Sequence, residues 1–314
     1  MRPGYPGSST DTTRAGYVTL VGRPNAGKST LLNSFVGSKL SIVTEKVQTT
    51  WQRVTGIATR AGAQMIFLDT PGLLAPRDML QRSMLLAAED AVREADVILL
   101  VLDASLAPDR ERTDRILSVL GDASTPVVVA VNKMDIAPPG TVAAWEAWAE
   151  GTLGPAAIHR ISALRQTGLS DLEEDLRENL PESPFLYPPE DMASEPVRFF
   201  VAELIRETVF EQFREEIPYS VFTRIEEYRA SQDPVYIGAT IYVERRSQKG
   251  ILVGKGGRAI RDLGRAARSK IEGFIGQPVY LDLWVKVLPG WRRKRDQLQR
   301  LGFQVPGEHD GVGA

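Results

Sequence analysis

Apolar and polar positions alternate in two different ways along the chain, and the change falls near residue 181. From residue 17 to about 180, short apolar runs are separated by amphipathic stretches such as 79–94 and 113–120. We expect the apolar runs to be strands at residues 17–21, 53–59, 64–68, 97–102, 127–131 and 157–161. Buried strands that alternate with helices predict an α/β domain, with a mostly parallel sheet and helices on both faces.

A proline-rich segment separates this domain from a second one with a different pattern. Residues 181–196 contain five prolines in sixteen residues and show no periodicity, which is typical of a semi-rigid linker. Beyond it we expect a helix at 197–215, strands at 220–228 and 236–243, a Gly-rich turn, a helix at 258–275 and a strand at 279–287. The pattern therefore predicts a disordered extension (1–15), an α/β domain (16–180), the linker (181–196), an α+β domain (197–290) and a basic tail (291–314).

Composition and charge narrow the class of protein. Apolar residues make up 43% of the chain and charged residues 25%, which is typical of a globular protein. The chain has no cysteine, which excludes a disulfide scaffold and thiolate zinc sites and fits a reducing cytoplasm. The longest purely apolar run, 97–102, is far shorter than the roughly 18 residues of a membrane span. Residues 1–16 lack the apolar core of a signal peptide.

The net charge of −2 hides a strong asymmetry. Residues 245–300 contain fifteen Lys and Arg against four Asp and Glu, a net charge of +11, so the other 258 residues sum to −13. A local excess of positive charge is the electrostatic signature of a polyanionic partner.

The first predicted strand leads into a phosphate-binding loop. Residues 22–30, GRPNAGKST, fit the pattern of Gly, four residues, Gly-Lys-Ser/Thr. Glycines at both ends let successive backbone N–H groups face phosphate oxygens, and the following helix adds its positive dipole end. Lys28 is expected to bridge the β- and γ-phosphates, and the Ser29 hydroxyl to ligate Mg²⁺. The expected nucleotide contacts here are Gly22, Arg23, Pro24, Asn25, Ala26, Gly27, Lys28, Ser29 and Thr30. A chance Gly-rich turn is the alternative, and a full match between a strand and a helix argues against it.

Three later motifs, each after a predicted strand, complete a guanine-nucleotide site. In DTPG at 69–72, Asp69 would hold the metal through water and the Gly72 N–H would sense the γ-phosphate. In NKMD at 132–135, the Asp135 carboxylate can accept two hydrogen bonds from guanine that adenine cannot offer. Asn132 and Lys133 would support that loop and stack on the base. In the third motif, Ser162-Ala163-Leu164, the Ala163 N–H would reach the guanine O6.

Together with QTT at 48–50, these motifs resemble the TrmE–Era–EngA branch of the translation-factor-class GTPases. The resemblance implies that Thr50, in the first switch loop, closes on Mg²⁺ in the GTP state, and that Asn25 is a ligand for K⁺. Leu73 follows DTPG where Ras-like enzymes place a water-orienting Gln, so K⁺ would supply the missing positive charge. A turn-stabilising side chain is the alternative for Asn25. Trp51 departs from the pattern, because the members of this branch with a KH domain usually have Arg after QTT.

The second domain contains another glycine loop, Gly254-Lys255-Gly256-Gly257, at the start of the long helix. It is typical of the GxxG loop of a KH domain, which clamps about four nucleotides. The helix is expected to bury Ile260, Leu263, Ala267, Ile271 and Phe274. A stripe about 140° away carries Arg258, Arg261, Arg265 and Arg268. A solvated helix face is the alternative, but the GxxG loop and the local charge favour RNA. The basic run at 292–295 is either a further RNA edge or a soluble tail.

One GTPase domain, a linker and one type II KH domain resemble a single-KH member of this branch over residues 15–300. The resemblance implies a slow cytoplasmic GTPase, expected to be a monomer, that binds GTP or GDP, Mg²⁺ and K⁺. It also implies GTP-gated binding of small-subunit (16S) ribosomal RNA near its 3′ end in small-subunit assembly, with peripheral contact at the inner membrane face. Alternatives are a membrane-peripheral switch whose basic domain meets anionic lipid, and a pseudo-GTPase scaffold. The GxxG loop argues against the first, and intact Lys28, Ser29, Asp69 and Asp135 argue against the second.

Overall fold

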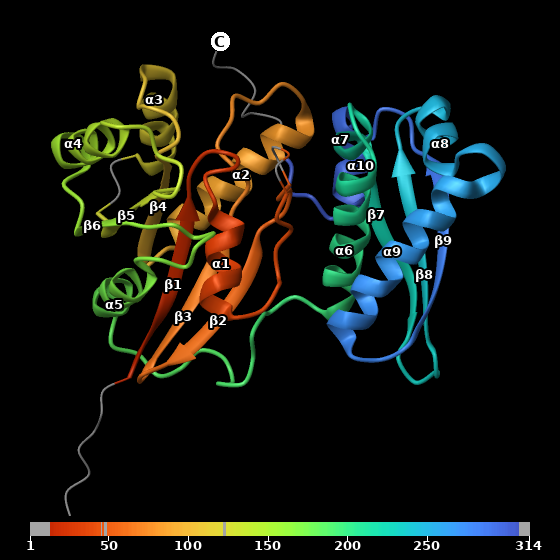
Figure 1. The fold of residues 1–314 in the computed structure, drawn as a ribbon, viewed down its shortest axis with the longest axis horizontal. Coiled ribbons are helices and arrows are strands. Elements are labelled where there is room, and N and C mark those ends of the chain that lie inside the picture. The colour runs from red at the N-terminus through yellow and green to blue at the C-terminus, as the bar shows by residue number, and fades with distance from the viewer. Residues whose placement is uncertain (1–12, 45, 47–48, 122–123, 308–314) are drawn as a thin grey trace, which may run out of the picture.

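The chain folds into two domains that lie side by side (Figure 1). The computed structural model describes residues 13–44, 46, 49–121 and 124–307. Most of the extension expected at 1–15 lies outside the described residues, but its last residues are ordered, because the first strand already begins at Arg14. No helix in the described part of the chain is both long and apolar enough to cross a membrane.

The first domain is built on a six-stranded sheet with the order β2-β3-β1-β4-β5-β6 in its described residues. The strands are β1 (Arg14–Val21), β2 (Val54–Arg60), β3 (Ala63–Asp69), β4 (Val97–Asp103), β5 (Val127–Asn132) and β6 (Ala157–Arg160). All pairs are parallel except β2 with β3, which is antiparallel and joined by a tight turn. All six expected strands are present, and the sheet is mostly parallel as predicted.

Helices cover both faces of this sheet. Helices α1 (Lys28–Val36) and α5 (Leu169–Asn179) pack on one face with the cluster around Phe67 and Leu99. Helices α2 (Met79–Glu94), α3 (Arg110–Leu120) and α4 (Thr141–Leu153) cover the other face. Because β1, β3 and β5 are parallel, the phosphate loop, DTPG and NKMD all follow strand ends at one edge of the sheet. This is where open α/β sheets bind their ligands.

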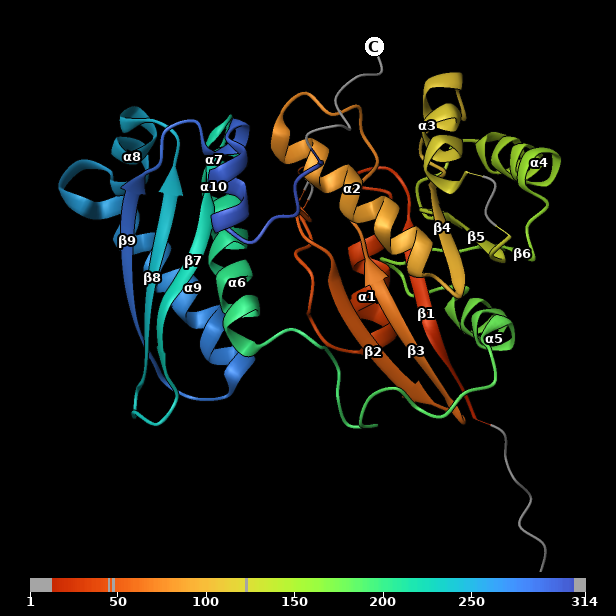
Figure 2. The same ribbon diagram turned by 180° about the vertical axis from the view of Figure 1, so that it is seen from behind.

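The second domain places its helices on one face of a three-stranded sheet (Figure 2). Its elements are α6 (Val197–Gln212), α7 (Ile217–Ser220), β7 (Phe222–Arg229), β8 (Val235–Val243), α8 (Arg246–Val253), η1 (Lys255–Gly257), α9 (Arg258–Ile275) and β9 (Val279–Val287). Strand β8 pairs antiparallel with β7 and parallel with β9. The core contains Leu263, Ala267 and Ile271, so the apolar face predicted for α9 is confirmed.

The proline-rich segment is attached to the first domain along its length. The Ile57 N–H donates to the Met192 carbonyl at 2.9 Å, and Gln64 accepts hydrogen bonds from the N–H groups of Leu186 and Tyr187. Tyr187 also packs against the cluster that contains Ile57. The connection is therefore held against the sheet of the first domain.

Residues 291–307 do not form a soluble tail, which was one of the two alternatives for the basic run. Trp291 is fully buried, and the segment forms η2 (Trp291–Arg293) and α10 (Arg295–Arg300). It packs on α2, where Arg292 pairs with Asp78 at 2.6 Å and the Ser83 hydroxyl donates to the Gln304 carbonyl. An apolar cluster joins the two domains here, formed by Trp51, Leu80, Met84, Trp291, Leu298 and Phe303.

Candidate functional site

The phosphate loop connects β1 to α1 and has little room for side chains. A Cβ on Gly27 would lie 2.2 Å from Asn132 Nδ2, and one on Gly22 would lie 2.4 Å from the Val101 carbonyl oxygen. Gly27 has φ +102° and Asn25 has φ +60°, both in the left-handed region, where glycine and asparagine are the residues best tolerated. The loop therefore has the shape that the GRPNAGKST pattern predicted.

Lys28 is buried at the base of this loop. Its Nζ donates to the carbonyl oxygens of Gly22 and Arg23, each at 3.0 Å. Burial lowers the pKa of Lys28 to about 8, while the nearby Asp69 carboxylate acts in the opposite direction. Phosphate oxygens in the loop would add negative charge and favour the charged lysine.

Oxygen atoms from three segments converge beside Lys28. The Ser29 hydroxyl donates to Asp69 Oδ2 at 2.7 Å, and Thr50 Oγ1 lies 3.2 Å from Ser29 Oγ and 3.5 Å from Asp69 Oδ2. The other carboxylate oxygen, Asp69 Oδ1, is buried without a hydrogen-bond partner among the described residues. Burial raises the pKa of Asp69, against the effects of Lys28 and the Ser29 hydroxyl. Two hydroxyls and a carboxylate are ligands that Mg²⁺ prefers, so these residues fit a magnesium ion.

Gly72 and Leu73 follow this cluster and lie against the phosphate loop. A Cβ on Gly72 would lie 2.5 Å from the Pro24 backbone nitrogen, and the Leu73 N–H donates to the Gly22 carbonyl at 3.1 Å. Leu73 is 1% exposed and packs in the core beneath α2. It is thus a packing residue of this core.

The base-recognition loop is positioned by the β4–β5 register, which pairs Asp103 with Asn132. Lys133 Nζ pairs with Asp103 Oδ2 at 2.7 Å, and the exposed Asp135 accepts the Ser162 hydroxyl at 2.6 Å. The Ser162 hydrogen bond is the main reason that the pKa of Asp135 lies below its usual range. The Asp135 carboxylate is therefore ionised at neutral pH, as guanine recognition requires.

Asn132 connects the phosphate loop to the loop at 162–164. Its Nδ2 donates to the Ala26 carbonyl at 2.7 Å, and its Oδ1 accepts the Ala163 N–H at 2.9 Å. The Ala163 N–H was expected to face the guanine O6, but in this structure it is used by Asn132. Asn132 thus holds the two loops together.

These loops enclose a cavity of about 520 Å³. Thirteen of the residues expected from the sequence line it, namely Pro24, Asn25, Gly27, Lys28, Ser29, Thr30, Thr50, Gly72, Asn132, Lys133, Asp135, Ala163 and Leu164. Thr49 of the QTT motif also lines it, and so do four residues outside the sequence motifs, Ile42, Val43, Thr44 and Ile136. Ile136 directly follows NKMD and is 62% exposed, and Leu164 is 75% exposed, so exposed apolar side chains line the cavity together with Asp135. Gln48 of the QTT motif lies outside the described residues.

The GxxG loop lies at the start of α9 with its backbone accessible. Gly254, Gly256 and Gly257 have φ of +70°, +61° and +73°, and Lys255 and Gly256 are exposed. No atom lies within 4 Å of where a Cβ on Gly256 would be. Glycine here lets another chain's backbone approach the loop closely.

An arginine row continues from the loop along α9, formed by Arg258, Arg261, Arg265 and Arg268, all of which are exposed. Arg261 also closes the loop, because its Nη2 donates to the Gly256 carbonyl at 3.0 Å. The exposed ion pairs of Arg265 and Arg268 with carboxylates of the same helix, at 3.5 and 3.8 Å, are long and weak. The row can therefore turn toward phosphates.

A phosphate loop, a base loop centred on an aspartate and a GxxG domain together define a guanine-nucleotide-binding protein with a KH domain. Family models agree: the 50S ribosome-binding GTPase family matches residues 17–133, and the KH domain family matches residues 216–292. The chain is 42% identical to the GTPase Era of Carboxydothermus hydrogenoformans over 292 residues, covering 92% of this chain and 98% of the relative. It is 40% identical to the GTPase Era of Heliobacterium modesticaldum over 303 residues, covering 92% and 97%. The chain belongs to the Era family of GTPases.

Solved structures lead to the same family. A point variant of Aquifex aeolicus Era bound to GDP and AlF4⁻ superposes with a TM-score of 0.88 at 36% identity, covering 93% of this chain and all of that one. An Era complex with MgGDPNP and nucleotides 1506–1542 of 16S ribosomal RNA gives the same TM-score at 37% identity and the same coverage. The P-loop GTPase fold followed by a KH domain, expected from the sequence, is confirmed.

Leu73→Ala should reduce stability and leave the chemistry nearly unchanged. Loss of a fully buried leucine costs about 2–5 kcal/mol in the free energy of unfolding. We expect GTP hydrolysis below the melting temperature to stay within about tenfold, or 1.4 kcal/mol of barrier. Leu100→Ala, which removes a fully buried side chain from the same core, is the matched control. A several-hundredfold loss in the Leu73 variant alone, with nucleotide affinity intact, would show that Leu73 has a catalytic role.

Proposed function

We propose that this chain binds 16S ribosomal RNA near its 3′ end through its KH domain, in a GTP-gated manner, during small ribosomal subunit assembly. The observation that carries the proposal is the accessible GxxG loop beside the exposed arginine row, in a chain whose other domain holds a guanine-nucleotide site. The Era complex with nucleotides 1506–1542 of 16S ribosomal RNA supports the choice of RNA.

The test is RNA binding by the full chain at fixed salt, since affinity for a polyanion depends steeply on ionic strength. An RNA with the 3′-terminal sequence of 16S RNA is compared with a scrambled RNA of equal length, with a non-hydrolysable GTP analogue and with GDP. Preference for the native sequence, and a difference between the two nucleotides, would support the proposal. Equal affinity for the native and the scrambled RNA would contradict the proposed sequence specificity. Equal RNA affinity with the GTP analogue and with GDP would contradict the proposed gating by GTP.

We propose that Lys28, Ser29, Thr50, Asp69 and Gly72 carry out GTP hydrolysis. Lys28 would neutralise phosphate oxygens, the Gly72 N–H would donate to the γ-phosphate, and Ser29, Thr50 and Asp69 would hold Mg²⁺. The bound ion would stabilise the charge that develops on the phosphates. The convergence of the three oxygen groups within 3.5 Å supports this assignment.

Hydrolysis should be faster in K⁺ than in Na⁺ at constant ionic strength. We propose that Asn25, which lines the cavity within the phosphate loop, contributes an oxygen to K⁺, whose charge would replace an arginine finger. Asn25→Ala should flatten the response to K⁺. The measurement is phosphate release in matched chloride salts, with Asn179→Ala, at the end of α5, as a control outside the site. Equal rates of the parent chain in the two salts would refute the role given to Asn25.

Cytoplasmic location and a monomeric state complete the proposal. The absence of cysteine from the sequence fits a reducing compartment. Peripheral contact with the inner membrane face is a separate expectation. The exposed arginine row is the surface that would meet anionic lipid. Sedimentation with vesicles that contain anionic lipid, at two salt concentrations, would detect it.

A further inference from the structure

Helix α6 places two consecutive buried side chains, Arg206 and Glu207, at the boundary between the domains. They are 2% and 1% exposed, although arginine and glutamate are rarely buried without partners. Both take partners from the segment between α1 and β2 of the GTPase domain. Thr50 lies in this segment.

Arg206 holds the residues on either side of Thr50. Its guanidinium pairs with Glu203 of the same helix at 2.9 and 2.6 Å, and its Nη2 donates to the Thr49 carbonyl. The same guanidinium lies over the Trp51 ring, with Cζ 4.7 Å from the ring centroid. Trp51 in turn contacts Trp291, with ring centroids 5.7 Å apart.

The position of Thr50 follows from these two contacts. Consecutive Cα atoms are about 3.8 Å apart across rigid, planar peptide units, so fixing residues 49 and 51 leaves residue 50 little freedom. The Thr50 hydroxyl is then 3.2 Å from Ser29 Oγ and 3.5 Å from Asp69 Oδ2. A shift of α6 by about 1 Å would be enough to break such contacts.

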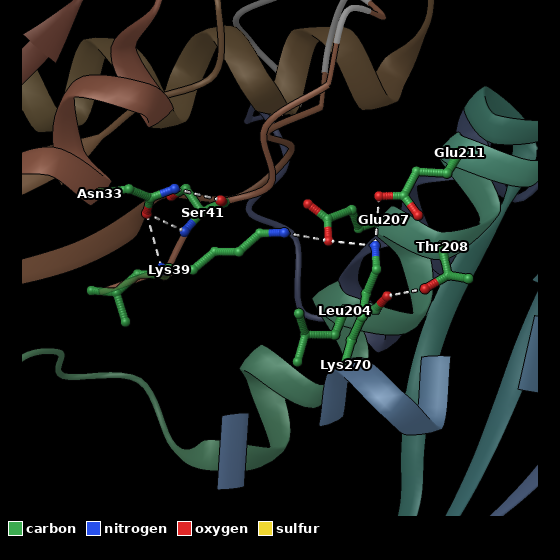
Figure 3. A network of polar contacts seen from close by, with 9 residues as sticks. Asn33, Lys39, Ser41, Leu204, Glu207, Thr208, Glu211 and Lys270 are labelled. Atoms are coloured by element: carbon green, nitrogen blue, oxygen red, sulfur yellow. Dashed lines mark hydrogen bonds and ion pairs between the residues drawn. The ribbon is translucent and has the colours of Figure 1, made fainter. Parts of the chain in front are cut away.

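The other end of the segment is tied to the same helix (Figure 3). Glu207 Oε2 accepts from Lys39 Nζ and Lys270 Nζ, each at 2.8 Å. Lys270 belongs to α9, the helix that begins at the GxxG loop, and it also pairs with Glu211 at 2.6 Å. Asn33 of α1 accepts the N–H of Ser41 at 3.0 Å and so fixes the chain next to Lys39. The RNA-facing helix and the segment that carries Thr50 are thus joined through α6.

We propose that Arg206 is a positioning residue for GTP hydrolysis, holding Thr50 beside Ser29 and Asp69 from the KH domain. The inference rests on the role proposed above for Thr50. The alternative is that Arg206 only fills space in the domain boundary. A buried charge costs several kcal/mol unless it is paired, so an apolar side chain would fill the space at lower cost. The guanidinium is a group that can bond to Glu203 and Thr49 and lie over the Trp51 ring at once.

The test compares Arg206→Met, Arg206→Lys, Thr50→Ala and the double variant Thr50→Ala/Arg206→Met. The control is Arg198→Met, at an exposed arginine of the same helix. Affinities for fluorescent GDP and for a fluorescent non-hydrolysable GTP analogue are measured in Mg²⁺, together with kcat and KM. Circular dichroism and thermal melting establish that each variant is folded.

Arg206→Met is expected to lower kcat and the affinity for the GTP analogue by about tenfold, and Arg206→Lys by about threefold. Affinity for GDP should change less than twofold, because GDP lacks the γ-phosphate beside which Thr50 closes. In the Thr50→Ala background, Arg206→Met should have no further effect, because both changes remove one interaction.

Three results would overturn the inference. The first is that the folded Arg206→Lys and Arg206→Met variants keep the kcat and the GTP-analogue affinity of the parent chain. If Arg206→Met does not fold, Arg206→Lys alone decides this point. The second is that the effects of Thr50→Ala and Arg206→Met on kcat are fully additive in the double variant. The third is that Arg206→Met lowers the affinity for GDP as much as the affinity for the GTP analogue. If Thr50→Ala itself has no effect, the role proposed for Thr50 fails as well.

Discussion

Asp135→Asn is expected to convert this GTPase from a GTP-binding into a xanthosine-triphosphate-binding protein. The Asp135 carboxylate would accept two hydrogen bonds from guanine, whereas an asparagine amide has one acceptor and one donor. Its NH2 group would face the guanine 2-amino group, and two donors would oppose each other. In xanthine the 2-amino group is replaced by an oxygen, which the amide can donate to. The substitution keeps the size and shape of the side chain.

We expect affinity for GTP to fall by about 100-fold or more, because a site built to bond a polar group strongly rejects the unmatched one. Competition of GTP and xanthosine triphosphate against a fluorescent nucleotide measures both affinities. Asp114→Asn, at an exposed aspartate of α3, is the matched control and should change neither. Undiminished GTP affinity in the Asp135 variant would contradict the assignment of the base loop.

The second large effect is expected in the KH domain, where Lys255→Asp/Gly256→Asp should abolish RNA binding. Two carboxylates would stand where the RNA backbone approaches, and like charges repel. The structure allows the change: Lys255 is exposed, the space around Gly256 is open, and aspartate tolerates its φ of +61° better than most residues. The core of α9, including Leu263 and Ile271, is not touched. Hydrolysis of GTP without RNA should therefore be unchanged.

A matched control is available in the first domain. Arg60→Asp/Gly62→Asp makes the same change in net charge in the exposed β2–β3 turn, where Gly62 also has φ +74° and open space. This variant should bind RNA like the parent chain. RNA affinity is measured by titration of a labelled RNA at several salt concentrations. If the Lys255/Gly256 variant keeps its RNA affinity and sequence preference, the GxxG loop is only a structural turn, and anionic lipid becomes the leading ligand of the basic face.

The arginine row should respond differently from the loop. Replacing Arg265 by Gln removes a charge but no backbone N–H, so binding to all RNA sequences should weaken similarly. The salt slope should fall by about 0.7 for each phosphate of a single strand that the protein no longer neutralises. Arg261→Gln should have an additional effect on the loop, because Arg261 donates to the Gly256 carbonyl. A change in sequence preference on replacing Arg265 would indicate that this side chain touches a base rather than a phosphate.

Much of the fold could be read from the sequence because strong local patterns coincide with the elements. Helices at 79–94 and 258–275 and the strand at 279–287 were predicted with the bounds that the structure gives. The antiparallel edge strand β2 was predicted as a strand but not in its direction, since a short apolar run does not specify its partner. The helix expected at 197–215 ends at Gln212, and a separate short helix, α7, follows.

Trp51 and Trp291 show where sequence reasoning stopped. Trp51 departs from the family pattern, and Trp291 precedes a basic run, so neither gave a local signal of its role. In the structure they pack together with Phe303 and Met84 and join the C-terminal segment to α2 and to the loop that carries Thr50. From the sequence alone, a basic run is predicted to be solvated, because the residues that pack against it in the folded chain are not known.

The sequence by itself determined which segments form the candidate nucleotide site, because each motif is a contiguous stretch with its own local backbone conformation. Gly27 and Lys28 lie in one loop between β1 and α1, and Asp135 lies in the loop that follows β5. Only the tertiary structure decided how the two domains are joined. Arg206 meets Thr49 across 157 positions of the chain, and Ser83 meets Gln304 across 221. Such contacts arise from the packing of buried surfaces, and since no local spacing or propensity encodes them, they become visible only when the chain is folded.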